Sequence, residues 1–83
     1  MDYLILTPNQ LASTLKNRRK SLELTQVETA KRVGLLPKTI SALESSPERC
    51  SVESLFKLIS VLDLELSLTE KSSRPEDRQN GEW

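Results

Sequence analysis

The chain has 83 residues, with twelve basic and twelve acidic side chains and hence a formal net charge of zero. One cysteine and no histidine exclude an intrachain disulfide and a zinc site of the usual kind. A domain of this size buries only a modest core, so we expect it to gain stability as a dimer.

Three features predict the cellular compartment. No stretch approaches the roughly 18 apolar residues of a membrane span, and the start from Met1 to Leu6 is acidic and too short for a signal peptide. The single thiol, Cys50, sits in a polar turn, which is typical of a reducing compartment. We therefore expect a cytoplasmic protein without membrane contacts.

The chain opens with an arm, residues 1–6, followed by a first helix over about 8–21. Thr7 is a good N-cap, Pro8 suits the first helical position, and Gln10 completes a capping box. Apolar residues then recur at helical spacing, at Leu11, Ala12, Leu15 and Leu22.

Two short helices follow, joined by a tight turn. The pattern T-x-x-E at 25–28 is a second capping box and Gly34 is a natural stop, so we expect a helix near 26–33. Pro37 suits the start of the next helix, and Pro47 forbids its continuation beyond about residue 45.

Ser51 caps a fourth helix over about 52–62. Its apolar face holds Leu55, Phe56, Leu58, Ile59 and Leu62. Over 63–70 the period changes, because Leu64, Leu66 and Leu68 alternate with polar residues, which predicts a short strand with one buried face.

A lone strand needs a partner for its backbone groups. The same strand of a second subunit, across a two-fold axis, supplies that partner and also provides the expected dimer. The segment from Tyr3 to Leu6 of the same chain is the alternative. The remaining residues, 71–83, are too polar to offset the entropy of ordering and predict a disordered tail, although the only tryptophan, Trp83, ends it.

The most informative unit runs from Thr25 to Leu43. Ala30 allows two helices to approach closely, Gly34 permits positive φ in the turn, and Ile40 fills the space between the helices. The residues T-Q-x-E-x-A-x-x-V-G followed by T-I-S-x-L-E resemble the Xre or lambda-repressor-like helix-turn-helix family over roughly 15–62. The resemblance implies a mainly all-α fold, with a four-helix domain at 7–62.

A closer resemblance is to HipB-type antitoxins. It rests on P-x-Q-L-A from Pro8, T-I-S from Thr39, the alternating L-E-L-S-L from Leu64, and the ending Q-N-G-E-W. This resemblance implies a homodimer whose post-helix strands pair through Leu64, Leu66 and Leu68. It also implies repression of its own operon and binding of a HipA-like serine/threonine kinase toxin or its accessory subunit. An isolated Trp83 on a flexible tether suits a partner pocket.

The helix-turn-helix resemblance assigns roles to individual residues. Gln26 starts the second helix, where its side chain and the free amides bind phosphate. Lys38, Thr39 and Ser41 lie in the first turns of the third helix, which enters the major groove, and Lys38 donates to guanine. Leu36 and Pro37 occupy positions where HipB relatives can carry polar base-reading side chains, and neither side chain can form a hydrogen bond to a base edge. Leu36 either touches a thymine methyl or belongs to the core.

Charge distribution supports this interpretation. Between Thr7 and Cys50 there are eight basic and four acidic residues, whereas Ser51 to Trp83 holds four basic and seven acidic ones. The basic half faces phosphate in this interpretation. Lys16, Arg19 and Lys20 lie on the polar side of the first helix and are further candidates for phosphate contacts.

The sequence thus predicts a dimeric repressor of palindromic operator DNA, with an antitoxin role. The alternatives are a repressor without a toxin and a protein-interaction adaptor that has lost DNA binding, which zero net charge and Pro37 favour. An enzyme is the least expected class, because histidine, a glycine-rich phosphate loop and a convergent carboxylate pair are missing from the sequence. We expect no cofactor.

Overall fold

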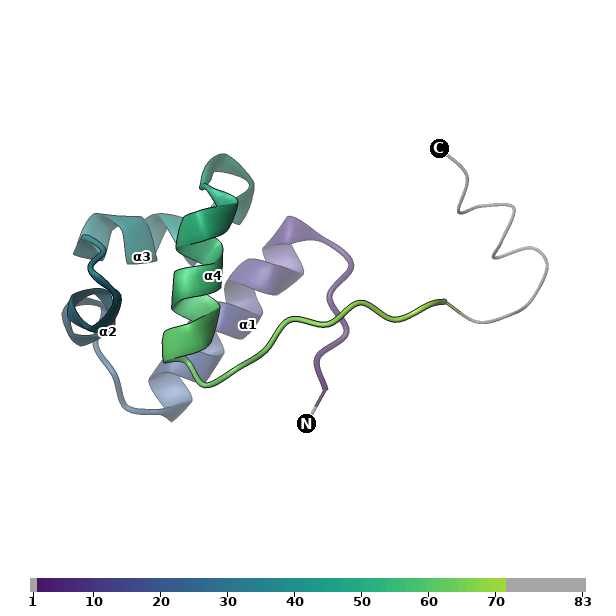
Figure 1. Ribbon diagram of the computed structural model, residues 1–83, viewed down its shortest axis with the longest axis horizontal. Helices are drawn as coiled ribbons and strands as arrows, with labels where there is room; N and C mark the ends of the chain where they lie inside the picture. The colour runs from purple at the N-terminus through teal and green to yellow at the C-terminus, as the bar shows by residue number, and fades with distance from the viewer. Residues whose placement is uncertain (1, 72–83) are drawn as a thin grey trace.

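The structure is a computed structural model that describes residues 2–71. It contains the helices α1 (Pro8–Ser21), α2 (Gln26–Val33), α3 (Pro37–Leu43) and α4 (Val52–Val61), with a short 3-10 helix, η1 (Pro47–Arg49), before α4 (Figure 1). These bounds confirm the four predicted helices. The predictions for the tail, including Trp83, fall on residues 72–83, outside the described residues.

Side-chain caps set the helix starts. The hydroxyl oxygen of Thr7 accepts from the backbone N–H of Gln10 at 3.1 Å, and the Gln10 side chain accepts from the Thr7 N–H at 3.2 Å. Thr25 and Glu28 form the same reciprocal pair at α2, at 3.0 and 2.9 Å. At α4 the Ser51 hydroxyl accepts from the Ser54 N–H. Both capping boxes read from the sequence are therefore present.

All four helices contribute to a single core. α2 packs against α3 and α4, while α1 and α3 pack against η1, and α4 lies in front of α1 in Figure 1. The buried cluster consists of Leu15, Ala30, Ile40, Leu43, Leu58, Ile59 and Leu62. Ala30 and Ile40 lie at its centre as predicted, with exposed fractions of 1% and 0%.

The apolar face predicted for α4 is too broad at one position. Phe56 is 51% exposed in the single chain, whereas Leu58, Ile59 and Leu62 are buried. The helical period explains this, because Leu58 and Leu62 are four residues apart on the core-facing side and Phe56 lies off that side. Phe56 instead lines a surface groove with Ile59, Ser60, Asp63, Leu64 and Leu66.

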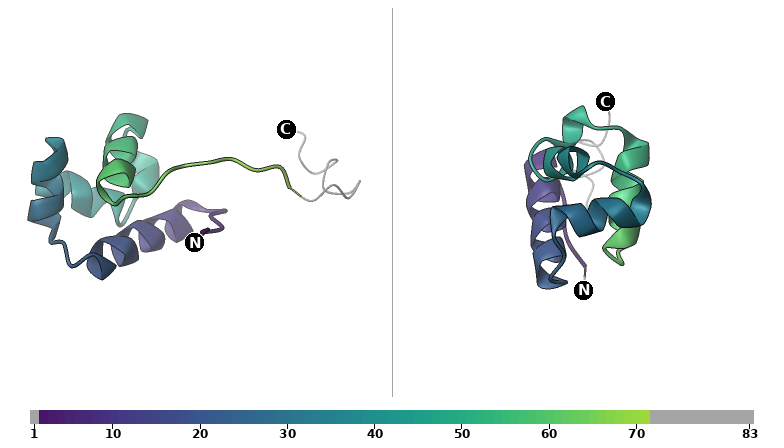
Figure 2. Two further views of the ribbon diagram at one scale, coloured as in Figure 1. Left: turned by 60° about the horizontal axis from the view of Figure 1, so that its bottom comes forward. Right: turned by 90° about the vertical axis from the view of Figure 1, so that its left-hand side faces the viewer.

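The predicted strand at 63–70 has no partner within the described residues. Asp63 adopts a left-handed conformation with φ of +58° and closes α4, so the extended segment begins only at Leu64. No backbone hydrogen bond joins this segment to residues 3–6 within the described part of the chain. Figure 1 shows the two segments crossing in projection, and the left view of Figure 2 separates them. Pairing across a dimer stays a prediction.

Candidate nucleic-acid interface

The turn between α2 and α3 depends on one glycine. Gly34 has φ of +69° and ψ of +31°, and its N–H donates to the carbonyl oxygen of Ala30. The N–H of Leu35 donates to the same oxygen at 3.0 Å. A Cβ atom at Gly34 would meet nothing within 4 Å, so backbone conformation rather than space requires glycine here. The turn therefore fixes the angle at which α3 leaves α2.

Arg19 lies in the interior, and our placement of it on the polar side of the first helix is wrong. Its Nε donates to Glu44 Oε2 at 2.6 Å, and its Nη2 donates to Glu44 Oε1 at 3.1 Å. The third nitrogen, Nη1, donates to the carbonyl oxygen of Leu24 at 2.7 Å. Arg19 and Glu44 are each only 8% exposed. Arg19 follows Leu15 by four residues and so shares its buried face.

Gln26 at the start of α2 contacts this ion pair. Its Nε2 donates to Glu44 Oε1 at 3.3 Å, and the side chain is half-buried. A carboxylate accepts but does not donate, so Glu44 holds the nitrogen end of the amide toward itself. The amide group carries a second N–H, which leaves a donor for an anion at the start of the helix. The sequence analysis did not identify Glu44 as a positioning group for Gln26. Its spacing is the available signal, because a charged residue four positions after the core residue Ile40 lies on the buried face and needs a buried partner.

The first turns of α3 present polar groups on the side opposite the core. Lys38 and Ser41 are exposed and three residues apart, which places them on one face. Thr39 is half-buried, and its N–H donates to the carbonyl oxygen of Leu36 at 2.9 Å. Ile40 and Leu43 point into the core with 0% exposure. α3 thus has the division into a polar face and a buried face that a recognition helix needs.

The other two residues predicted to contact phosphate are both accessible. Lys16 and Lys20 are exposed on α1, in keeping with their predicted placement. In the right-hand view of Figure 2, α2 and α3 lie together on the side of the molecule that faces the viewer.

Among residues 2–71, no group of three or more histidine, cysteine, aspartate or glutamate side chains has metal-binding geometry. None of the described helices is long and apolar enough to span a bilayer.

Known proteins match this chain over most of its length. A family model described as Helix-turn-helix matches residues 15–68. Antitoxin HipB of Escherichia coli K12 is 37% identical over 82 residues, which cover 95% of this chain and 93% of that protein. Antitoxin HipB of Escherichia coli O6:H1 is 37% identical over 82 residues, which cover 95% of this chain and 87% of that protein. The chain belongs to the HipB family of helix-turn-helix proteins.

Solved structures of the HipB family share the fold. A chain of the HipA-HipB-O2-O3 complex superposes with a TM-score of 0.81 at 32% identity, over 86% of this chain and 100% of the other. A chain of the HipB-O4 20mer complex gives a TM-score of 0.80 at 32% identity, again over 86% of this chain and 100% of the other. The predicted resemblance and the mainly helical helix-turn-helix fold are therefore confirmed.

Proposed function

We propose that this chain is a dimeric, operator-binding repressor and the antitoxin subunit of a HipA-type toxin–antitoxin pair. The observation that carries the proposal is the α2–turn–α3 unit, in which Lys38 and Ser41 are exposed on α3 while Ile40 and Leu43 are buried in the core. Membership of the HipB family supports both parts, since HipB relatives have been solved in the HipA-HipB-O2-O3 and HipB-O4 20mer complexes.

In this proposal the start of α3 enters the major groove of the operator. Lys38 donates to the O6 and N7 atoms of guanine, and Thr39 and Ser41 bond to a base edge or a phosphate. Gln26 donates its second amide N–H to a phosphate, while Lys16 and Lys20 add phosphate contacts. Arg19 plays no direct part, because Glu44 and the Leu24 carbonyl engage its three nitrogens.

A second copy of the chain covers the apolar surface beyond α4. Leu66 and Leu68 are 56% and 94% exposed, and Leu64 is half-buried against the core. Leucines that alternate along an extended segment suit pairing with the same segment of a second subunit. The groove at Phe56 adjoins them and extends the dimer surface. The dimer then sets two copies of α3 about 34–36 Å apart, for successive major grooves of a palindrome.

The antitoxin role places a HipA-like serine/threonine kinase toxin, or its accessory subunit, as the second partner, with Trp83 as the anchor. The proposal assigns no reaction to this chain, and it places the protein in the cytoplasm. A repressor without a toxin is the alternative, and a kinase gene next to this one on the chromosome would argue against it.

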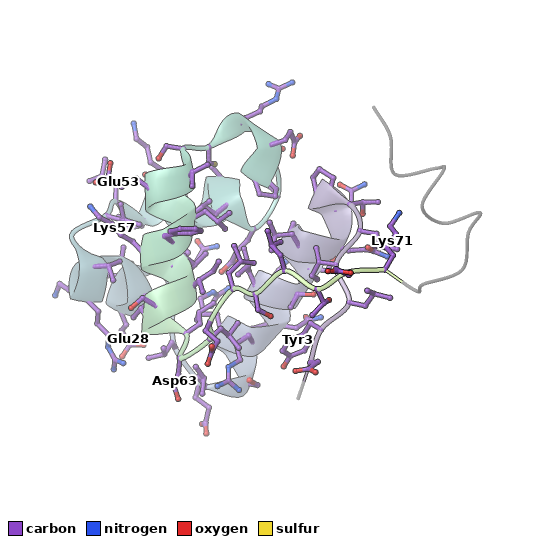
Figure 3. All side chains as sticks on the ribbon, turned by 45° about the vertical axis from the view of Figure 1, so that its right-hand side comes forward. Tyr3, Glu28, Glu53, Lys57, Asp63 and Lys71 are labelled. Carbon is purple, nitrogen blue, oxygen red and sulfur yellow. The ribbon has the colours of Figure 1, made fainter. Side chains whose placement is uncertain are left out.

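A salt-titrated binding assay on DNA from the gene's own promoter tests the proposal. We compare wild type with Lys38→Ala and with the control Lys57→Ala, whose ammonium pairs with Glu53 on α4 at 3.8 Å (Figure 3). Tight, palindrome-dependent binding that weakens with salt, and that is weakened and less specific only in Lys38→Ala, supports the proposal. Wild type that prefers this promoter no more than random DNA at low salt overturns it and favours the adaptor.

A further inference from the structure

An apolar side chain stands at the start of the recognition helix, where the core does not use it. Leu36 is the N-cap of α3, with φ of −88° and ψ of 149°, and its side chain makes no capping hydrogen bond. It is 58% exposed. Serine, threonine, aspartate and asparagine stabilise this position and leucine does not. Leu36 therefore contributes neither a cap nor much core packing to the single chain.

The two residues after Leu36 set the chemistry of the first turn of α3. Pro37 occupies the first helical position and has no N–H and no polar side-chain atom. Lys38 follows, exposed to solvent. The first turn of α3 thus presents an apolar group and then a cation, with no hydrogen-bond donor between them.

Base edges in the major groove offer a single apolar feature, the methyl group at C5 of a pyrimidine. The other major-groove groups are hydrogen-bond donors or acceptors, which leucine cannot satisfy. The exposed apolar groove at α4 is lined by Phe56, Leu64 and Leu66 and does not include Leu36. The dimer surface of the proposed function therefore does not account for Leu36.

We infer that Leu36 is a specificity-determining residue that packs against the C5-methyl group of a pyrimidine, close to the guanine that Lys38 binds. This inference rests on the proposed function, since it requires α3 to lie in the major groove. Two pyrimidines carry this group, thymine and 5-methylcytosine, and the experiment separates them.

The test uses promoter duplexes in which deoxyuridine replaces thymine, one symmetric pair of positions at a time. This change removes only the methyl group. At one pair of positions we expect wild type to lose about fourfold in affinity per half-site, in line with the burial of one methyl group. Leu36→Ala is expected to bind the thymine and uracil duplexes equally. The control Val52→Ala removes an apolar side chain that is 66% exposed at the start of α4 and should keep the wild-type discrimination.

A second set of duplexes carries 5-methylcytosine in place of cytosine. Tighter binding by wild type at one pair of positions, absent in Leu36→Ala, assigns the methyl group to 5-methylcytosine and supports the same contact. The inference is overturned if wild type binds the promoter but ignores every methyl change, or if Leu36→Ala keeps the discrimination. A wild-type protein that prefers the promoter no more than random DNA instead overturns the proposed function, so the two failures are distinct.

Discussion

Arg19 and Glu44 form a bidentate ion pair in the interior, with Arg19 Nε 2.6 Å from Glu44 Oε2 and Nη2 3.1 Å from Oε1. The pair joins α1 to the residue that directly follows α3. Because the Leu24 carbonyl oxygen accepts from Arg19 Nη1, the guanidinium also fixes the position of the backbone just before α2. No buried side-chain nitrogen or oxygen in the described part of the chain lacks a hydrogen-bond partner. The pair therefore connects the recognition helix to the rest of the domain.

Arg19→Met is expected to lower the free energy of unfolding by about 3–5 kcal/mol, because it leaves the Glu44 carboxylate buried without its cation. Chemical denaturation at a fixed protein concentration measures the loss. Lys57→Ala is the matched control, since it breaks an exposed pair worth less than about 1 kcal/mol. Equal losses in the two variants would contradict the structural role of the buried pair.

Sequence reasoning located the helices because their start and stop signals are local. Thr7, Thr25 and Gly34 each act on residues within one turn of themselves, so their pattern is readable without a fold. The burial of Arg19 cannot be predicted from local signals, because its partner Glu44 lies 25 residues away in sequence. The charge of Arg19 favours solvent, whereas its spacing of four residues from the buried Leu15 places it in the interior. The extended segment from Leu64 makes no backbone hydrogen bond to residues 3–6 within the described part of the chain, so its pairing across a dimer stays a prediction.

Gly34→Ala is expected to lower the stability of the domain by about 1–2 kcal/mol, because an L-residue is strained at positive φ. No steric contact adds to this loss, since the position is open. Glu23→Gly is the opposite case: Glu23 already adopts φ of +59° between α1 and α2, so glycine there relieves strain. Thermal unfolding should rank Glu23→Gly at or above wild type and Gly34→Ala below it. An unchanged Tm in Gly34→Ala would refute the argument.

Glu28 gives the capping box of α2 a pH dependence. The Thr25 N–H donates to its carboxylate, and this hydrogen bond lowers the pKa of Glu28 below its ordinary value of 4.5. A lowered folded-state pKa stabilises the fold above the unfolded pKa, and this stability is lost as pH falls through the folded pKa. Glu28→Gln keeps an acceptor but does not titrate. The Tm of wild type minus that of Glu28→Gln should therefore fall from pH 7 to pH 3. The control Glu48→Gln changes an exposed carboxylate in η1, and its Tm difference from wild type should change less over the same range.

Gln26→Ala and Lys38→Ala are expected to weaken DNA binding in different ways. Gln26 contacts phosphate in the proposed complex, so its loss should reduce affinity for operator and random DNA by a similar factor. Lys38 contacts a base, so its loss should cost about 1–3 kcal/mol on the operator and relax specificity at one position. Competition binding with both duplexes measures the ratio. A Gln26→Ala variant that loses affinity for the operator alone would assign Gln26 to base recognition.

Leu66→Glu is expected to convert the dimer to a monomer, because it places a charge on the apolar side of the extended segment where the same segment of the second subunit pairs. Leu4→Glu is the control, since Leu4 is 80% exposed in the arm that is the alternative partner. Sedimentation equilibrium measures the oligomeric state, and circular dichroism checks that both variants keep their helices. A monomeric Leu66→Glu with weakened operator binding supports strand pairing across the dimer, since each monomer then meets one half-site. A dimeric Leu66→Glu would remove the extended segment from the interface.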